Sequence, residues 1–188
     1  THLTEIIRAN AAELLGREET KQLIDHMRET SPILVDELTP TPLSVGEIQK
    51  VLARLLAENV SIRNLPVIFE TLADYSQFTS DIELLTEYAR QALARQITAS
   101  GPLQVLTVSN EVEELVSNHI QATEHGNFLA LPPQTSQQIL EAFANEVERV
   151  ALMDQTPVVL CSPTVRMYIR QMTERHFPQI PILSYNEL

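Results

Sequence analysis

The spacing of the apolar residues changes once along this chain, at Ser100-Gly101-Pro102. Before that point, apolar residues recur at helical spacing in one segment after another. After it, short apolar runs such as Leu103–Val108 and Val158–Cys161 alternate with amphipathic helical segments. The sequence therefore predicts an α+β, multidomain fold. An all-helical module over residues 1–101 is followed by a small α/β module with a partly parallel sheet over residues 102–188.

Capping signals locate the helices of the first module. Ser44 with Glu47 three residues later forms a capping box, and Ser80 or Asp81 begins a later helix. Asn64 is predicted to cap a helix that carries a proline in its first turn. We also expect a helix capped by Thr1 and ended by Gly16, with a buried side formed by Leu3, Ile6, Ile7, Leu14 and Leu15. A second helix is expected over Glu18–Glu29, followed by an ordered connector over Ser31–Pro42 packed by Ile33, Leu34, Val35 and Leu38.

The second module is predicted to contain alternating strands and helices. In chain order we expect a strand at Leu103–Val108, a helix ended by Gly126, a short strand at Phe128–Leu131, a helix from Thr135, a strand at Val158–Cys161, a helix over Pro163–His176 and a closing strand at Ile180–Ser184.

The charge and the composition exclude several classes of protein. The formal net charge is −12, so the surface should repel nucleic acid and anionic lipid. The single cysteine, Cys161, excludes an internal disulfide and a thiolate-cluster metal site. No apolar run approaches the roughly 20 residues of a membrane helix. Because the chain begins at Thr1 without a methionine, we expect a piece of a longer protein, with any membrane anchor upstream.

Two patterns suggest other functions. Cys161 and Arg166 flank a strand-to-helix loop that is similar to the phosphate loop of cysteine-dependent phosphatases, which would make the chain an acidic cytosolic α/β enzyme fragment. The spacing is one residue too short, however, and the loop has no glycine. Ile48–Tyr75 resembles a DNA-binding helix-turn-helix, but its second helix carries Glu70 and Asp74 with no basic residue after Arg63.

No constellation in the sequence indicates catalysis. The five histidines are scattered without metal-ligand spacing, and no glycine-rich phosphate loop or dinucleotide fingerprint occurs. We therefore expect no enzyme activity, no metal, no cofactor and no small-molecule substrate.

Several ordered motifs resemble a known family. They are Leu43–Leu52, Val60–Leu65, Ile182–Glu187, His2–Ile7, Glu13–Arg17, Leu84–Tyr88 and Pro157–Cys161. Together they are similar to the C-terminal cytoplasmic region of the FlhA/LcrD/InvA family, the export-gate proteins of flagellar and virulence type III secretion. The segment Leu15–Lys21 favours the flagellar branch.

The resemblance implies a protein-binding scaffold. Residues 1–101 would be the third cytoplasmic subdomain with a fringe of the first, and residues 102–188 the fourth. Nine such tails would form a ring at the cytoplasmic face of the bacterial inner membrane. The ring would receive other export proteins and complexes of substrates with their chaperones.

Arg63 is the candidate interaction residue. Within the matching motifs it carries a charge that neither a buried core position nor a helix cap requires, and arginine provides several donors at protein interfaces. The alternative is an ion pair within the module to Glu70 or Asp74, which complete the candidate interaction set.

Overall fold

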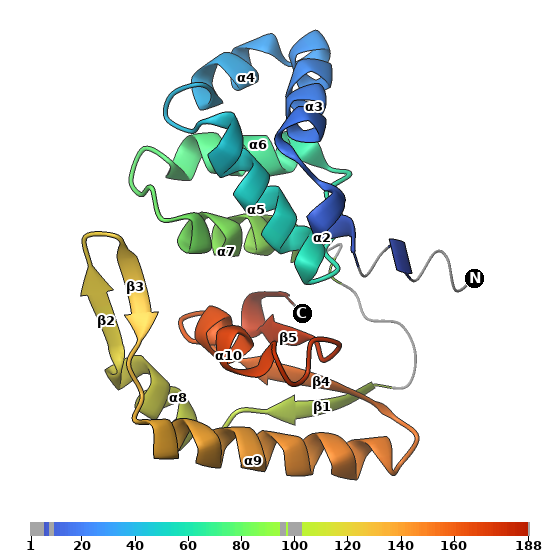
Figure 1. Ribbon diagram of the computed structural model, residues 1–188, viewed down its shortest axis with the longest axis vertical. Coiled ribbons are helices and arrows are strands. Elements are labelled where there is room, and N and C mark those ends of the chain that lie inside the picture. Colours follow the sequence, from blue (N-terminus) through green and yellow to red (C-terminus); the bar gives the residue numbers. More distant parts are fainter. Residues whose placement is uncertain (1–5, 8–9, 95–96, 98–102, 188) are drawn as a thin grey trace. The chain divides into compact units, whose positions relative to one another are not determined.

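The structure, a computed structural model, describes residues 6–7, 10–94, 97 and 103–187 (Figure 1). It separates into two compact units, residues 1–97 and residues 98–188. Each unit has a hydrophobic core of its own. The first is helical and the second is α/β with a small parallel sheet, so the predicted fold class is confirmed.

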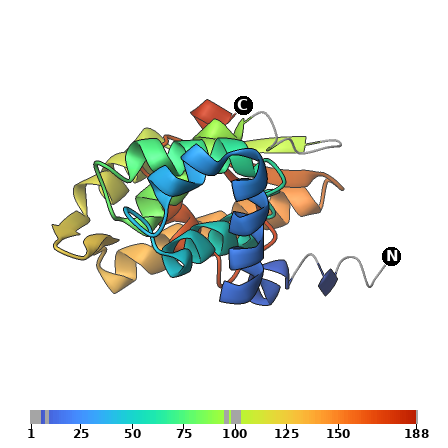
Figure 2. The same ribbon diagram turned by 90° about the horizontal axis from the view of Figure 1, so that it is seen from above.

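The helical unit is built around α5. In chain order its helices are α2 (Ala11–Leu14), α3 (Arg17–Thr30), α4 (Pro32–Leu38), α5 (Val45–Ala57), α6 (Leu65–Tyr75) and α7 (Ile82–Ala92). α5 packs against α2, α3 and α7, while α6 packs against α4 and α7. Figure 2 looks onto this unit and shows the sharp turn between α3 and α4. The helical spacing of Ile48, Val51, Leu52 and Leu55 leaves all four side chains fully buried, which makes α5 the centre of the core.

Two predicted helix caps are confirmed. The Ser44 hydroxyl accepts a hydrogen bond from the Glu47 N–H at 3.3 Å, and the Glu47 carboxylate accepts one from the Ser44 N–H at 2.8 Å. Asp81 accepts hydrogen bonds from the two N–H groups at the start of α7. Asn64 lies at the N-cap position of α6, but its side chain makes no capping hydrogen bond.

The connector Ser31–Pro42 is ordered, but the structure corrects its details. Residues Pro32–Leu38 form α4, because a proline is compatible with the first turn of a helix. Val35 and Leu38 are fully buried, as expected, whereas Ile33 is 74% exposed on the outer side of that helix.

The first predicted helix is only partly described. Its described parts are the helical residues 6–7 and the short helix α2. The expected burial is wrong for Ile6, Ile7 and Leu14, which are 45%, 51% and 63% exposed. Thr1, the predicted cap, and Leu3 lie outside the described residues.

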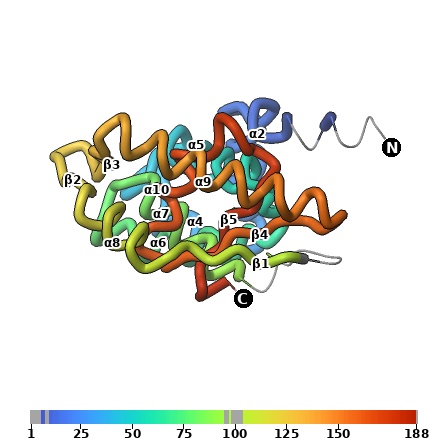
Figure 3. The backbone as a smooth tube through the Cα atoms, turned by 90° about the horizontal axis from the view of Figure 1, so that it is seen from below, coloured from blue at the N-terminus to red at the C-terminus, as the bar shows by residue number. Residues whose placement is uncertain are grey.

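The α/β unit contains a three-stranded parallel sheet and a separate hairpin. Its elements are β1 (Leu103–Thr107), α8 (Asn110–Asn118), β2 (Ile120–Thr123), β3 (Gly126–Leu129), α9 (Pro133–Ala151), β4 (Thr156–Cys161), α10 (Arg166–Thr173), β5 (Ile182–Ser184) and the 3-10 turn η2 (Tyr185–Glu187). The strand order is β1-β4-β5, with β4 in the centre (Figure 3). Both connections advance in the same direction across the sheet, so right-handed crossovers place their helices on one face.

That face of the sheet carries the core of the unit. Val159 and Cys161 of β4 pack with Val116 of α8 and Ile169 of α10, and Phe143 of α9 packs against this cluster. β4 is buried along nearly its whole length, as its continuous apolar run predicts for a central parallel strand.

The segment after α8 differs from the prediction. α8 ends at Asn118, and residues that were expected to continue it to Gly126 form the antiparallel hairpin β2–β3. Gly126 has a φ of 118°, a conformation open mainly to glycine, so it shapes the hairpin turn instead of ending a helix. The predicted strand Phe128–Leu131 overlaps β3, which begins and ends two residues earlier. α10 is shorter than predicted, because Ser162–Val165 form a turn before it.

The capping box of α5 should make a pH-dependent contribution to stability. Hydrogen bonds from the backbone N–H and the hydroxyl of Ser44 lower the pKa of Glu47. A lowered pKa in the folded state adds stability at neutral pH, and this is lost as the pH falls through the folded pKa. We expect Ser44→Ala to reduce the free energy of unfolding by about 1 kcal/mol at neutral pH. Urea titrations of both chains should show a smaller difference well below pH 4.5, the ordinary value for Glu47. Ser44→Thr is the control that retains the hydroxyl, and equal stability of all three chains at neutral pH would contradict this account.

The two units should also fold separately, because each has its own core. Residues 1–99 and 102–188, expressed apart, are expected to retain slowly exchanging amides in α5 and β4, respectively. Hydrogen exchange followed by mass spectrometry measures this. A fragment that exchanges completely within the dead time would show that its core depends on the other half of the chain.

Candidate protein-interaction surface

The turn after α5 fixes the position of Arg63. Asn59 has a φ of 59°, the left-handed conformation that ends many helices and that asparagine tolerates well. The Val60 N–H donates to the Leu55 carbonyl and the Asn59 N–H donates to the Leu56 carbonyl, both at 2.9 Å. These two bonds form a Schellman motif, and Val60 and Leu55 are both buried in the core of the helical unit, as is common for this motif.

Beyond this turn the chain alternates between core and surface. Val60 is 4% exposed, and Ile62 packs against the core of the helical unit. Ser61 and Arg63, the residues between and after them, are exposed. Two apolar anchors therefore hold Arg63 outward at the entrance to α6.

The predicted interaction residues do not form one cluster. Glu70 and Asp74 are exposed on α6 and lie one turn apart on the same side of the helix. Within the described part of the chain, no ion pair joins either carboxylate to Arg63. The alternative role of Arg63, an ion pair within the module, is therefore not observed.

Arg63 borders a hollow of about 710 Å³. The remaining lining comes from Ala11 of α2, Leu56 of α5 and the turn residues Asn59–Ile62. Its lining combines apolar side chains such as Leu56 and Ile62 with polar groups of the turn. Beside the exposed guanidinium, this mixed lining suits a partner that presents an apolar side chain next to a carboxylate.

Two ion pairs join the end of α5 to α7, and sequence reasoning missed both. Arg90 of α7 lies 3.2 Å from the carboxylate of Glu58 at the end of α5, and their side chains are 3% and 15% exposed. Arg54 of α5 and Glu83 of α7 approach to 2.5 Å. The partners are far apart in the sequence, so spacing alone gave no signal for either pair.

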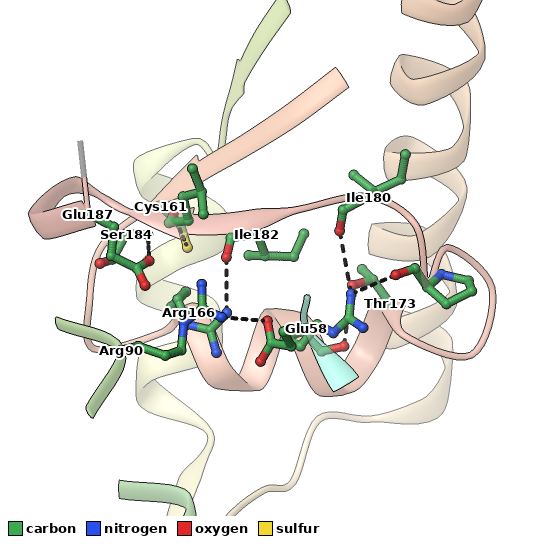
Figure 4. Close-up of polar contacts among 12 residues, drawn as sticks. Glu58, Arg90, Cys161, Arg166, Thr173, Ile180, Ile182, Ser184 and Glu187 are labelled. Carbon is green, nitrogen blue, oxygen red and sulfur yellow. Dashed lines mark hydrogen bonds and ion pairs between the residues drawn. The ribbon is translucent and has the colours of Figure 1, made fainter. Parts of the chain in front are cut away.

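The Cys161–Arg166 loop cannot hold a phosphate as the phosphatase alternative requires (Figure 4). Cys161 is fully buried, with its Sγ atom 3.6 Å from the Leu183 carbonyl. Arg166 is 1% exposed and donates from Nη1 to the Ile182 carbonyl at 2.9 Å, within the protein. The N–H of Ser162 donates to the Glu113 carboxylate at 2.7 Å, so a negative group already occupies the loop.

The helix-turn-helix alternative also fails on charge. The exposed side of α6, the would-be recognition helix, presents Pro66, Glu70 and Asp74. Carboxylates there would face DNA phosphates with the wrong sign.

The described residues form neither a metal site nor a membrane-spanning helix. No group of three His, Cys, Asp or Glu side chains is placed to hold a metal ion. No described helix is long and apolar enough to span a membrane.

Comparisons with known proteins identify the family. The model of the FHIPEP family matches residues 1–188. The chain belongs to the FHIPEP family. It is 58% identical to "Flagellar biosynthesis protein FlhA" of Bacillus subtilis (strain 168) over the whole chain, and it spans 28% of the length of that relative.

Solved structures of similar proteins share the fold of this FHIPEP-family chain. The Chlamydia pneumoniae CdsV protein superposes with a TM-score of 0.89 at 32% identity, covering 100% of this chain and 55% of that one. The nonameric EPEC SctV-C structure gives 0.83 at 34% identity, covering 99% and 57%. A complex of Chlamydia pneumoniae CdsV and CdsO gives 0.84 at 31% identity, covering 100% and 56%.

The buried state of Cys161 leads to a direct chemical test. We expect iodoacetamide to alkylate the native chain far more slowly than the chain unfolded in urea, because the thiol has no exposed surface. Cys161→Ser should fold normally, since a hydroxyl can donate to the Leu183 carbonyl. Neither chain should hydrolyse p-nitrophenyl phosphate. Fast alkylation of the native chain, or hydrolysis that Cys161→Ser abolishes, would restore the phosphatase interpretation.

Proposed function

We propose that this chain is the cytoplasmic docking part of a flagellar type III protein export gate. The observation that carries the proposal is the match to the FHIPEP family over all 188 residues, with 58% identity to a flagellar relative across the whole chain. The chain acts by non-covalent binding and not as an enzyme.

The longer protein forms a ring of nine through this region. The nonameric SctV-C structure supports this, because 99% of this chain superposes on 57% of its subunit. Residues 1–101 are the third cytoplasmic subdomain, with a fringe of the first, and residues 102–188 are the fourth. The ring lies at the cytoplasmic face of the bacterial inner membrane, held by membrane helices of the longer protein.

The partners are other export proteins and complexes of substrates with their chaperones. The structure of CdsV with CdsO supports the first group, because a relative that contains this fold forms a complex with a second protein. The formal charge of −12 opposes nucleic acid as a partner. No cofactor or small-molecule substrate is part of the proposal.

Arg63 makes contacts between subunits or with another export component. It is exposed, it borders a hollow with a partly apolar lining, and it has no ion pair with Glu70 or Asp74 within the described residues. Glu70 and Asp74 provide a second, acidic patch on the same unit for a basic partner.

Reversing the charge of Arg63 tests this role. Arg63→Glu places a negative charge near the positive end of α6, so the melting temperature of the chain should fall little or rise slightly. A partly desolvated interface would instead meet a reversed charge, which is far more costly. We expect the full-length protein carrying Arg63→Glu to lose ring formation or secretion of flagellar proteins.

The matched control is Arg175→Glu, the same charge reversal at another exposed arginine. It should leave secretion unchanged. A lowered melting temperature with normal secretion in Arg63→Glu would show that Arg63 serves the fold and not an interface.

A further inference from the structure

The outer edge of β1 has unpaired backbone groups. The Val108 N–H donates to the Leu160 carbonyl of β4 at 3.0 Å. With the parallel register, this bond determines which residues of β1 direct their backbone groups toward β4. In a parallel strand, alternate residues direct both N–H and C=O to the same neighbour. Gln104 and Leu106 therefore bond toward β4, while Val105 and Thr107 direct their backbone groups away from it.

These outward groups remain available for another strand. β1 is at the end of the strand order β1-β4-β5, and within the described residues no hydrogen bond involves the N–H or C=O of Val105 or Thr107. Natural edge strands are usually protected by a charged side chain, a proline or a bulge. The sequence of β1, Leu-Gln-Val-Leu-Thr, contains no charge and no proline.

A cavity of about 380 Å³ adjoins this edge. Every residue from Gln104 to Val108 lines it, although successive side chains of a strand point to opposite faces. The cavity therefore reaches from the sheet face to the strand edge. Its opposite wall is one side of α9, including Ile139 and Phe143. An added strand could place alternate apolar side chains in this space while its backbone pairs with β1.

The charge of the unit indicates the kind of segment that would bind. Residues 102–188 contain ten acidic residues but only four arginines and no lysine. Arg166 and Arg170 are buried, and Arg149, at the cavity, is paired with Glu146 at 2.8 Å. A basic segment is therefore favoured over an acidic one.

We propose that the outer edge of β1 and the adjoining cavity bind an extended, cationic segment of a second protein by β-strand addition. The backbone of the segment pairs with Val105 and Thr107, its apolar side chains enter the cavity, and its basic side chains face the acidic surface. This binding site belongs to the α/β unit and does not depend on the role proposed for Arg63.

The test uses the complete 188-residue chain and a fluorescent peptide of about ten residues that alternates valine and lysine. Fluorescence anisotropy measures binding, and hydrogen exchange resolved by residue follows the amides of Val105 and Thr107. We expect saturable binding that protects these two amides. A valine–glutamate peptide of the same length should bind at least about tenfold more weakly, and so should a valine–lysine peptide N-methylated along one edge.

Val105→Pro removes an N–H that points away from β4, so no hydrogen bond between β1 and β4 is lost. Edge strands tolerate proline at such outward-facing positions. The substitution should weaken peptide binding by about tenfold or more, while Val105→Thr, which keeps the N–H, should bind normally. Slow exchange of the β4 amides in both variants confirms that the sheet is intact. Ala142→Trp, at an exposed α9 position on the cavity wall, provides a second variant that leaves β1 unchanged and should also weaken binding.

Three results would overturn the proposal. The first is no binding of the valine–lysine peptide. The second is binding that Ala142→Trp abolishes but Val105→Pro and N-methylation leave intact, which would mean that the cavity accepts a segment in another conformation. The third is concentration-dependent dimerisation that protects Val105 and Thr107 without peptide, which would make a second copy of the chain the occupant.

Discussion

The parallel pairing on both sides of β4 determines how the α/β unit is built. Because β4 is the central strand, its backbone forms hydrogen bonds with both β1 and β5. Its side chains on one face are apolar, since they contact α8, α9 and α10. The register with β1 then decides which groups of β1 are used and which remain available. The hydrophobic core on one face of the sheet and the unpaired outer edge of β1 therefore both follow from the pairing of β4 with its neighbours.

The helical unit depends in a similar way on α5. Four apolar side chains of that helix form the centre of the core, and a capping box begins the helix while a Schellman motif ends it. The position of the second cap determines where Arg63 lies. It buries Val60 and thereby directs Arg63 to the surface at the start of α6. A local backbone preference, that of Asn59 for the left-handed conformation, is thus linked directly to the candidate interaction surface.

The sequence predicted features that depend on local spacing. The capping box at Ser44, the cap at Asp81 and the buried strand β4 all follow from residues close together in the chain. The prediction was wrong where one residue suits two structures. Gly126 can end a helix or shape a hairpin turn, and Pro32 can interrupt a helix or begin one.

Features that depend on distant residues could not be predicted from spacing. The ion pair of Arg90 with Glu58 and the cavity beside β1 exist only after the helices and strands have packed. The family motifs helped with function but not with these details. Arg63 was singled out because its charge served neither core nor cap, and the structure shows it exposed.

The long connection between β1 and β4 also has a consequence for the order of folding. A helix, a hairpin and a second helix separate these two strands, whereas β4 and β5 are joined through α10 alone. Closing the longer loop costs more chain entropy, and contacts between distant residues form more slowly. β4 and β5 are therefore expected to pair first, with β1 joining last. On the ribosome this order is a constraint, because β1 is synthesised before either strand and must remain unpaired until β4 has emerged.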